Sequence, residues 1–170
     1  MRAIVLAFAA ASAVACGQEA SDGTAAPATQ PALSDRTIRP GEGIGPLRLG
    51  MRYAEARAIL GDGETIASQR LGFARYPALG LELVLTTPTA DAVTPDSRVI
   101  AIGARGPGDW RGTPRPGDRR EDVVRALGAP DRVGERDFFA KGAAVQYASP
   151  DASDAIAIAV FASWTERPTP

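Results

Sequence analysis

The sequence predicts an α+β fold built from two helix-plus-antiparallel-hairpin repeats, with both helices packed on one face of the sheet. The first observation is an internal repeat. Residues 45–61 align without a gap on residues 112–128, and six of the 17 aligned positions are identical. An apolar stripe at helical spacing and a pair of strand-like segments then occur in each copy. We therefore expect repeat 1 over residues 37–105 and repeat 2 over residues 106–167, packed as one compact domain.

The chain begins with the features of a secretory signal. Arg2 precedes an apolar run and small residues that end at Cys16, the only cysteine. The run is too short for a transmembrane helix, which needs about 20 apolar residues. It resembles a bacterial lipoprotein signal, which implies that residues 1–15 are removed and that Cys16 is acylated. Ala13-Val14-Ala15 also fits an ordinary cleavage site, so plain secretion stays open.

Residues 16–36 are predicted to form the lipidated cysteine and a flexible linker. Small and polar residues dominate this stretch, and Leu33 is its only large apolar residue. A flexible coil of this length has a root-mean-square reach of roughly 25 Å. The linker would therefore keep the folded domain close to the membrane that holds the lipid.

Each repeat is expected to start with one short helix. The apolar stripes are Tyr53, Ala56 and Leu60 in the first copy, and Val123, Val124 and Leu127 in the second. Gly61 and Gly128 follow the last turns and are predicted to end the helices. In the second copy, Asp118 and Glu121 have the spacing of a capping box, in which two side chains satisfy backbone N–H groups at the helix start.

Strand-like segments follow each helix. An aromatic residue, a turn with glycine and an alternating stretch occur in both copies, over residues 76–85 and 138–147. Residues 99–102 and 156–160 are predicted to be the closing strands of the two hairpins. In the pair Phe138 and Phe139, one side chain should be buried and the other partly exposed, because neighbouring side chains of a strand point to opposite faces.

Composition argues against several classes of function. The chain has no histidine, which removes the commonest general base and the commonest transition-metal ligand. A net charge of -1 gives no electrostatic preference for nucleic acid. We therefore predict a protein that is not an enzyme, has no cofactor and binds neither metal nor nucleic acid.

The helix pattern Gly-Met-x-x-x-Glu-Ala-x-x-x-Leu-Gly of residues 50–61, repeated less closely in residues 117–128, precedes an aromatic-x-x-x-Gly hairpin. In a short envelope lipoprotein, this combination resembles the BamE-like and β-lactamase-inhibitor-protein-like group. Its single-copy members are outer-membrane assembly lipoproteins, and its tandem-copy members include a secreted enzyme inhibitor. The resemblance implies noncatalytic protein binding. This chain departs from the former by its duplication and from the latter by its lack of disulfides, and no binding residue carries over.

The candidate contact site lies at the junction of the two copies. Five arginines gather there, at positions 105, 111, 115, 119 and 120. They could contact an anionic group such as a lipid headgroup or an acidic partner, or they could be solvated loop residues. Trp110, in the same glycine-rich loop, could be an exposed interface anchor or could fold back over the sheet. We take Trp110, Arg111 and Arg115 as the candidate partner-binding residues.

Two further constellations are weak. The aspartate pairs at 91 and 96 and at 151 and 154 lack the ligand density of a calcium loop. A Ser-Lys hydrolase would need Lys141, the only lysine, beside Ser149 or Ser153. An envelope hydrolase is therefore the weakest functional hypothesis.

The leading hypothesis is a noncatalytic, lipid-anchored periplasmic protein that presents a protein-binding surface, with envelope or outer-membrane assembly as its candidate role. Its partners would be the membrane, through the N-terminal lipid, and an envelope protein. Gly17 after the acylated cysteine resembles the pattern of lipoproteins that proceed to the outer membrane, so its periplasmic face is the expected location. The alternative is a secreted, soluble inhibitor or small-ligand carrier, which would require that Cys16 is not acylated.

Overall fold

The computed structural model describes residues 33–68, 71–87, 92–106 and 108–162. The predicted signal, Cys16 and most of the predicted linker lie outside these residues. The described part belongs to one compact unit.

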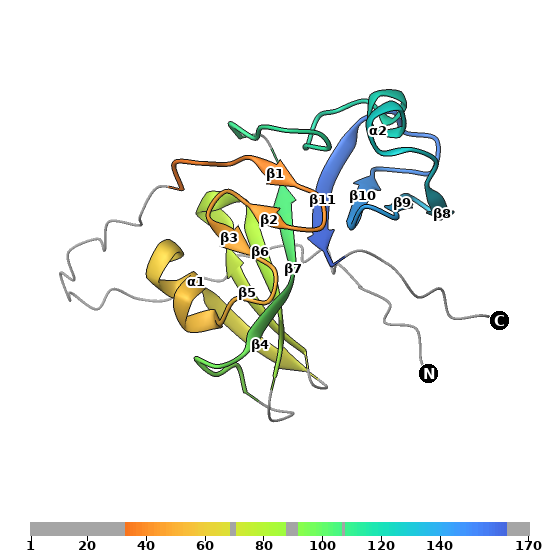
Figure 1. The fold of residues 1–170 in the computed structure, drawn as a ribbon. Coiled ribbons are helices and arrows are strands. Elements are labelled where there is room, and N and C mark those ends of the chain that lie inside the picture. Colours follow the sequence, from red (N-terminus) through yellow and green to blue (C-terminus); the bar gives the residue numbers. More distant parts are fainter. Residues whose placement is uncertain (1–32, 69–70, 88–91, 107, 163–170) are drawn as a thin grey trace, which may run out of the picture. The chain divides into compact units, whose positions relative to one another are not determined.

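An eight-stranded antiparallel sheet is the largest element of the structure (Figure 1). Its order in space is β4-β5-β6-β7-β11-β10-β9-β8, so each half of the chain supplies four consecutive strands and the halves meet where β7 pairs with β11. The strands are β4 (Glu64–Ser68), β5 (Leu71–Tyr76), β6 (Leu81–Thr86), β7 (Arg98–Arg105), β8 (Asp131–Val133), β9 (Arg136–Phe139), β10 (Ala143–Tyr147) and β11 (Ala155–Phe161).

Each half also contains one eight-residue helix. Helix α1 (Tyr53–Leu60) precedes β4, and α2 (Arg120–Leu127) precedes β8. A single turn of 3₁₀ helix, η1 (Pro77–Leu79), connects β5 with β6. The apolar stripe of each helix is directed inward as predicted: Tyr53, Ala56 and Leu60 are buried in α1, and Val123 is buried in α2 with Val124 and Leu127 partly buried beside it.

The two helices start differently. In α1, the Glu55 carboxylate accepts a hydrogen bond of 2.8 Å from the backbone N–H of Arg52, which satisfies one of the donors that a helix start leaves unpaired. The capping box predicted for α2 is wrong. Arg119, not Asp118, is the residue before the first turn, and no side chain caps it. Asp118 instead accepts hydrogen bonds from the backbone N–H and the Nε of Arg115, both at 3.0 Å.

A second, three-stranded sheet precedes α1. Its strands β1 (Ile38–Arg39), β2 (Gly43–Ile44) and β3 (Leu47–Arg48) have two residues each. Strand β2 contacts both β7 and β11, so this small sheet lies over the line where the two halves of the large sheet meet. Ile44 and Leu47 are completely buried there.

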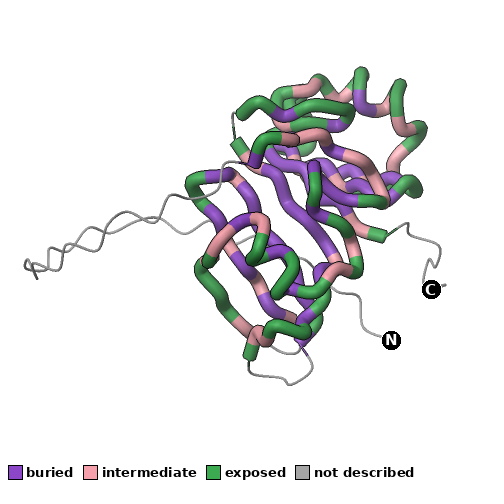
Figure 2. The backbone as a smooth tube through the Cα atoms, turned by 60° about the vertical axis from the view of Figure 1, so that its left-hand side comes forward, coloured by how far each residue is buried: buried purple, intermediate pink, exposed green. Residues whose placement is uncertain are grey.

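One hydrophobic core joins both helices, the small sheet and the strands of the large sheet other than the edge strands β4 and β8 (Figure 2). Leu83, Ile102 and Ile158 from the sheet pack in it with residues of both helices and of the small sheet. Burying each such side chain contributes about 1.5–3 kcal/mol. Phe139 is buried in the core and its neighbour Phe138 is half-buried, as predicted for adjacent residues of a strand.

The predicted fold class is wrong. The structure is 46% strand and 15% helix, with an eight-stranded and a three-stranded antiparallel sheet, and it is mostly β and not an α+β arrangement of helix-plus-hairpin repeats. The missed strands are β1, β2, β3, β4, β8 and most of β5.

The missed strands share a physical cause. Strands β4 and β8 are the edges of the large sheet, and their side chains are almost all exposed, so no alternation of apolar and polar residues marks them. In β5 the residues toward the core are Gly72, Ala74 and Tyr76, while the larger Phe73 faces away from it. Small residues on the buried face hide the strand pattern.

Candidate binding sites around Trp110 and on the sheet

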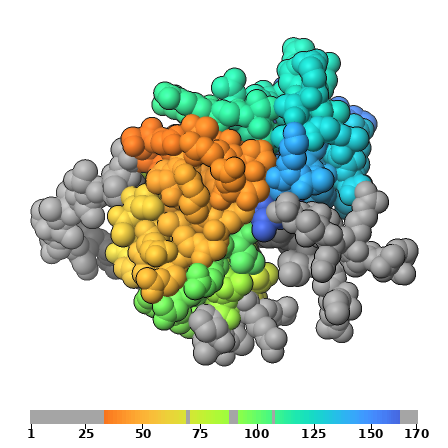
Figure 3. All heavy atoms as spheres, in the orientation of Figure 1, coloured from red at the N-terminus to blue at the C-terminus, as the bar shows by residue number. Residues whose placement is uncertain are grey.

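The segment between β7 and α2 is held by the residues that lead into β1. The backbone N–H of Ile38 donates to the carbonyl of Arg111 at 2.8 Å, and the N–H of Arg111 donates to the carbonyl of Arg36 at 3.2 Å. In Figure 3 this segment, in green, lies along the orange N-terminal residues. Two parts of the chain about 75 residues apart therefore form one surface.

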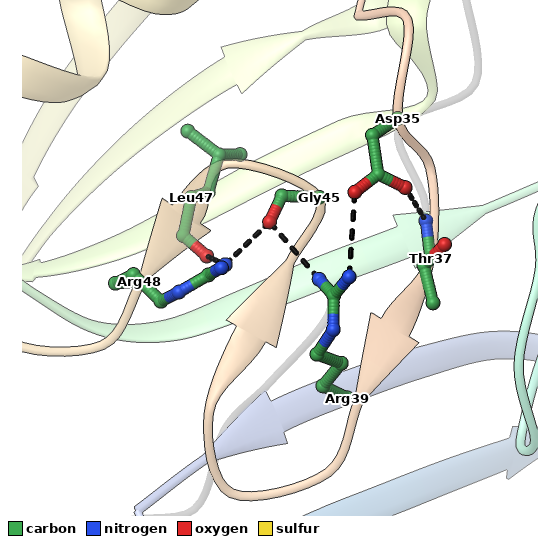
Figure 4. A network of polar contacts seen from close by, with 6 residues as sticks. All are labelled: Asp35, Thr37, Arg39, Gly45, Leu47 and Arg48. Atoms are coloured by element: carbon green, nitrogen blue, oxygen red, sulfur yellow. Dashed lines mark hydrogen bonds and ion pairs between the residues drawn. The ribbon is translucent and has the colours of Figure 1, made fainter.

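A polar network fixes the N-terminal side of this surface (Figure 4). Asp35 accepts a hydrogen bond from the backbone N–H of Thr37 at 2.9 Å and pairs with Arg39 at 3.4 Å. Hydrogen bonds from Thr37 lower the pKa of the Asp35 carboxyl. Arg39 and Arg48 both donate to the carbonyl of Gly45. Gly45 has φ +55°, and an added Cβ would lie 1.9 Å from the Asp35 carbonyl oxygen, so only glycine fits this turn.

Trp110 is part of the core. Its side chain is only 3% exposed, and its Nε1–H donates to the carbonyl of Gly106 at 3.2 Å. The guanidinium carbon of Arg36 lies 4.9 Å from the centre of the ring, within the range of a cation–π contact. Of the two interpretations considered for Trp110, an exposed anchor does not fit this burial, and a ring folded back over the sheet does.

A pocket of about 470 Å³ lies beside Trp110. The three predicted residues Trp110, Arg111 and Arg115 all line it, together with Leu33, Ser34, Arg36 and Asp109. Arg36 was not among the predicted residues, because residues 16–36 have the composition of a flexible linker. Leu33 was the available signal: this one large apolar residue of the stretch is buried in the core.

The guanidinium groups of the pocket are held to different degrees. Arg36 donates to the carbonyl of Leu79 at 3.3 Å. Arg115 donates to the carbonyl of Trp110 at 3.4 Å and forms a 3.0 Å ion pair with Asp118. Among the described residues, no carboxylate lies within ion-pair distance of the Arg111 side chain, which is exposed. The pocket thus contains two positioned arginines and one that can move toward a ligand.

A buried charge cluster lies at the start of α2. Asp137 in β9 is completely buried, and its carboxylate lies 3.2 Å from the Nε of Arg120 and 3.7 Å from that of Arg132. The Arg120 guanidinium carbon is 3.8 Å from the centre of the Tyr147 ring. Burial raises the pKa of Tyr147. These contacts join α2 to β9 and β10, and nothing in the sequence pattern indicated them.

The large sheet has a second face that does not belong to the core. Val84, Ala101, Ala157 and Ala159 are buried, yet they are absent from the single core cluster that the helices and the small sheet share. The strand register places Ile66, Phe73, Val84, Ala101 and Phe161 in one row across this face. Beside that row, Glu82 pairs with Arg75 at 3.0 Å and with Arg105 at 4.0 Å. We call this the second face.

Ile66 is the most accessible large residue of that row. It lies on edge strand β4 and is 50% exposed. Val133 on the opposite edge strand, β8, is 65% exposed, and the register places it on the same face. The second face therefore combines accessible apolar side chains at its edges with small buried residues and a charged group near its middle.

The described residues do not form the contacts that the hydrolase or metal-site hypotheses would need. Lys141 donates to the carbonyl of Ala126 at 3.3 Å, and Ser153 Oγ contacts Asp154 at 3.2 Å. In the described ranges no hydrogen bond joins Lys141 to either serine, and no three acidic residues lie close enough to hold a metal ion.

No family model matches this chain, and no curated protein or solved structure has significant similarity to it. The resemblance of residues 50–61 to the BamE-like group therefore stays a prediction, as does acylation of Cys16. Within the part of the chain that the structure describes, neither helix is long and apolar enough to cross a bilayer.

Proposed function

We propose that this chain is a noncatalytic, lipid-anchored envelope protein that binds another protein. The observation that supports it best is the second face, where apolar and charged side chains lie together outside the core. Its accessible apolar side chains are Ile66 and Val133 at the edges, and exposed apolar residues bordered by polar ones are typical of protein-interaction surfaces. The predicted lipid would act with this surface, because anchoring raises the effective concentration of the domain near membrane partners.

The anchoring part is tested by intact mass and membrane fractionation of wild type and a Cys16→Ser variant. We expect wild type in the membrane fraction with an acylated Cys16 at its N-terminus, and the variant in the soluble fraction. A soluble wild-type product with unmodified Cys16 would contradict the anchoring proposal and favour the secreted inhibitor or carrier.

The binding part is tested by site-specific photo-crosslinking in cells, with the crosslinking amino acid at position 66 or 65. Ile66 lies on the second face, and the neighbouring Thr65 points to the opposite side of the same exposed strand. We expect a discrete crosslinked product from position 66 and none from position 65. Equal products from both positions, or none from either, would contradict the assignment of the second face.

A further inference from the structure

We propose that the Trp110 pocket is a phosphate-binding site, which in the anchored protein receives the headgroup of an anionic phospholipid. The first argument is chemical. Three arginines, Arg36, Arg111 and Arg115, line one pocket together with Ser34. A guanidinium presents N–H donors in a planar fork that matches phosphate oxygens, and its charge strengthens those hydrogen bonds.

The second argument is preorganisation. Arg36 is fixed by the Trp110 ring and by the carbonyl of Leu79, and Arg115 is fixed by Asp118 and the carbonyl of Trp110. Side chains that are already ordered lose little conformational entropy when a ligand binds. Arg111 is exposed and has no ion-pair partner among the described residues, so its charge is available to an incoming anion.

Asp109 is the one carboxylate that lines the pocket. It reduces the positive charge there and should weaken anion binding. Removing its charge should therefore raise the affinity for phosphate, whereas removing an arginine charge should lower it. At about 470 Å³, the pocket is larger than a phosphate ion needs and leaves room for the glycerol portion of a headgroup.

The location supports a lipid source, and this step rests on the proposed anchoring. Leu33 and Ser34 border the pocket, 17 and 18 residues after the predicted acylated Cys16. By the scaling for flexible linkers, such a chain has a root-mean-square reach of roughly 23 Å. A pocket at the point where the tether enters the domain therefore stays near the headgroup layer.

The phosphate site is tested with the mature chain, residues 16–170, carrying Cys16→Ser so that no lipid is attached. A Trp164→Phe change leaves Trp110 as the only tryptophan, and its fluorescence is followed during titration with inorganic phosphate at constant ionic strength. We expect a saturable change in fluorescence, an affinity for phosphate about tenfold lower in Arg111→Gln, and a higher affinity in Asp109→Asn.

The control variant is Arg57→Gln, which removes the same charge from the exposed face of α1 and should bind phosphate like the parent chain. A signal that does not saturate, or the same affinity in Arg111→Gln, would overturn the proposal.

The lipid source is tested with the same Cys16→Ser chain by flotation with vesicles. We expect binding to phosphatidylglycerol vesicles and little to phosphatidylcholine vesicles, with competition by inorganic phosphate and loss in Arg111→Gln. Phosphate binding without any binding to phosphatidylglycerol vesicles would refute the lipid source. Both experiments use an unacylated chain, so their outcome is independent of whether Cys16 carries a lipid in cells.

Discussion

At the scale of single residues, two buried groups hold the second half of the molecule in place. Trp110 closes the core beside the segment that leads to α2, and Asp137 neutralises Arg120 at the start of that helix. Both were invisible or ambiguous in the sequence. Trp110 lies in a glycine-rich loop without helix or strand periodicity, so the sequence does not indicate whether its side chain points inward or outward. Asp137 pairs with a residue distant in the sequence, so no local motif marks the pair.

Replacing Trp110 by alanine should lower the free energy of unfolding by about 3–5 kcal/mol, because a large buried ring leaves a cavity. Urea denaturation of the wild type and the variant measures this. Arg111→Ala is the matched control and should change stability by less than about 0.5 kcal/mol, since that side chain is exposed. A loss below about 1 kcal/mol for Trp110→Ala would show that the ring is not part of the core.

Asp137→Ala and Arg120→Ala should each destabilise the fold, by up to about 3–5 kcal/mol. The first leaves the largely buried Arg120 without its carboxylate, and the second leaves the buried Asp137 with only the longer, 3.7 Å contact to Arg132. In a double-mutant cycle, the double variant should lose much less than the sum of the single losses. The exposed pair Arg125 and Asp122 serves as the comparison, and breaking it should cost under about 1 kcal/mol. Additive losses at Asp137 and Arg120 would contradict a direct pair.

At the scale of elements, the helices and strands that could be predicted are those with a strong local pattern of apolar residues. Both helix stripes and the central strands were found, since their apolar residues face the core at regular spacing. The edges of the sheet were missed because β4 and β8 expose nearly all their side chains. The two-residue strands of the small sheet are too short to carry any period. Each missed strand is defined by its pairing partner and not by its own residues.

The two helix starts should respond differently to mutation. Glu55→Ala removes the acceptor for the Arg52 backbone N–H and should cost about 0.5–2 kcal/mol. Glu121→Ala, at the corresponding turn of α2, removes no such bond and should be nearly neutral. Thermal unfolding of both variants checks the difference, and equal shifts in melting temperature would contradict it.

At the scale of the whole molecule, the two halves depend on each other. Strands β7 and β11 pair along the centre of the sheet, and β2, from the first half, packs on both. The Trp110 pocket also combines residues from before β1 with residues after β7. The internal repeat suggested two similar halves, but nothing in the sequence indicated which strand of one half pairs with which strand of the other.

A fragment of residues 33–105 should therefore not fold cooperatively by itself. It would leave the long strand β7 unpaired on one side and expose the core residues that β11 covers. Circular dichroism during urea denaturation measures this, with residues 16–170 as the control. A sigmoidal transition in the fragment would show that the first half is an independent domain.

The central position of β11 has a consequence for how the protein is made. This strand is the last one along the described chain, yet it joins the two halves, so the sheet cannot be completed until the chain has been synthesised through Phe161. Until then, the nascent chain has no finished sheet that could resist threading through a narrow export channel. In the proposed envelope protein, this strand order would delay folding until after export, and the final pairing of β7 with β11 would be slow because it is long-range.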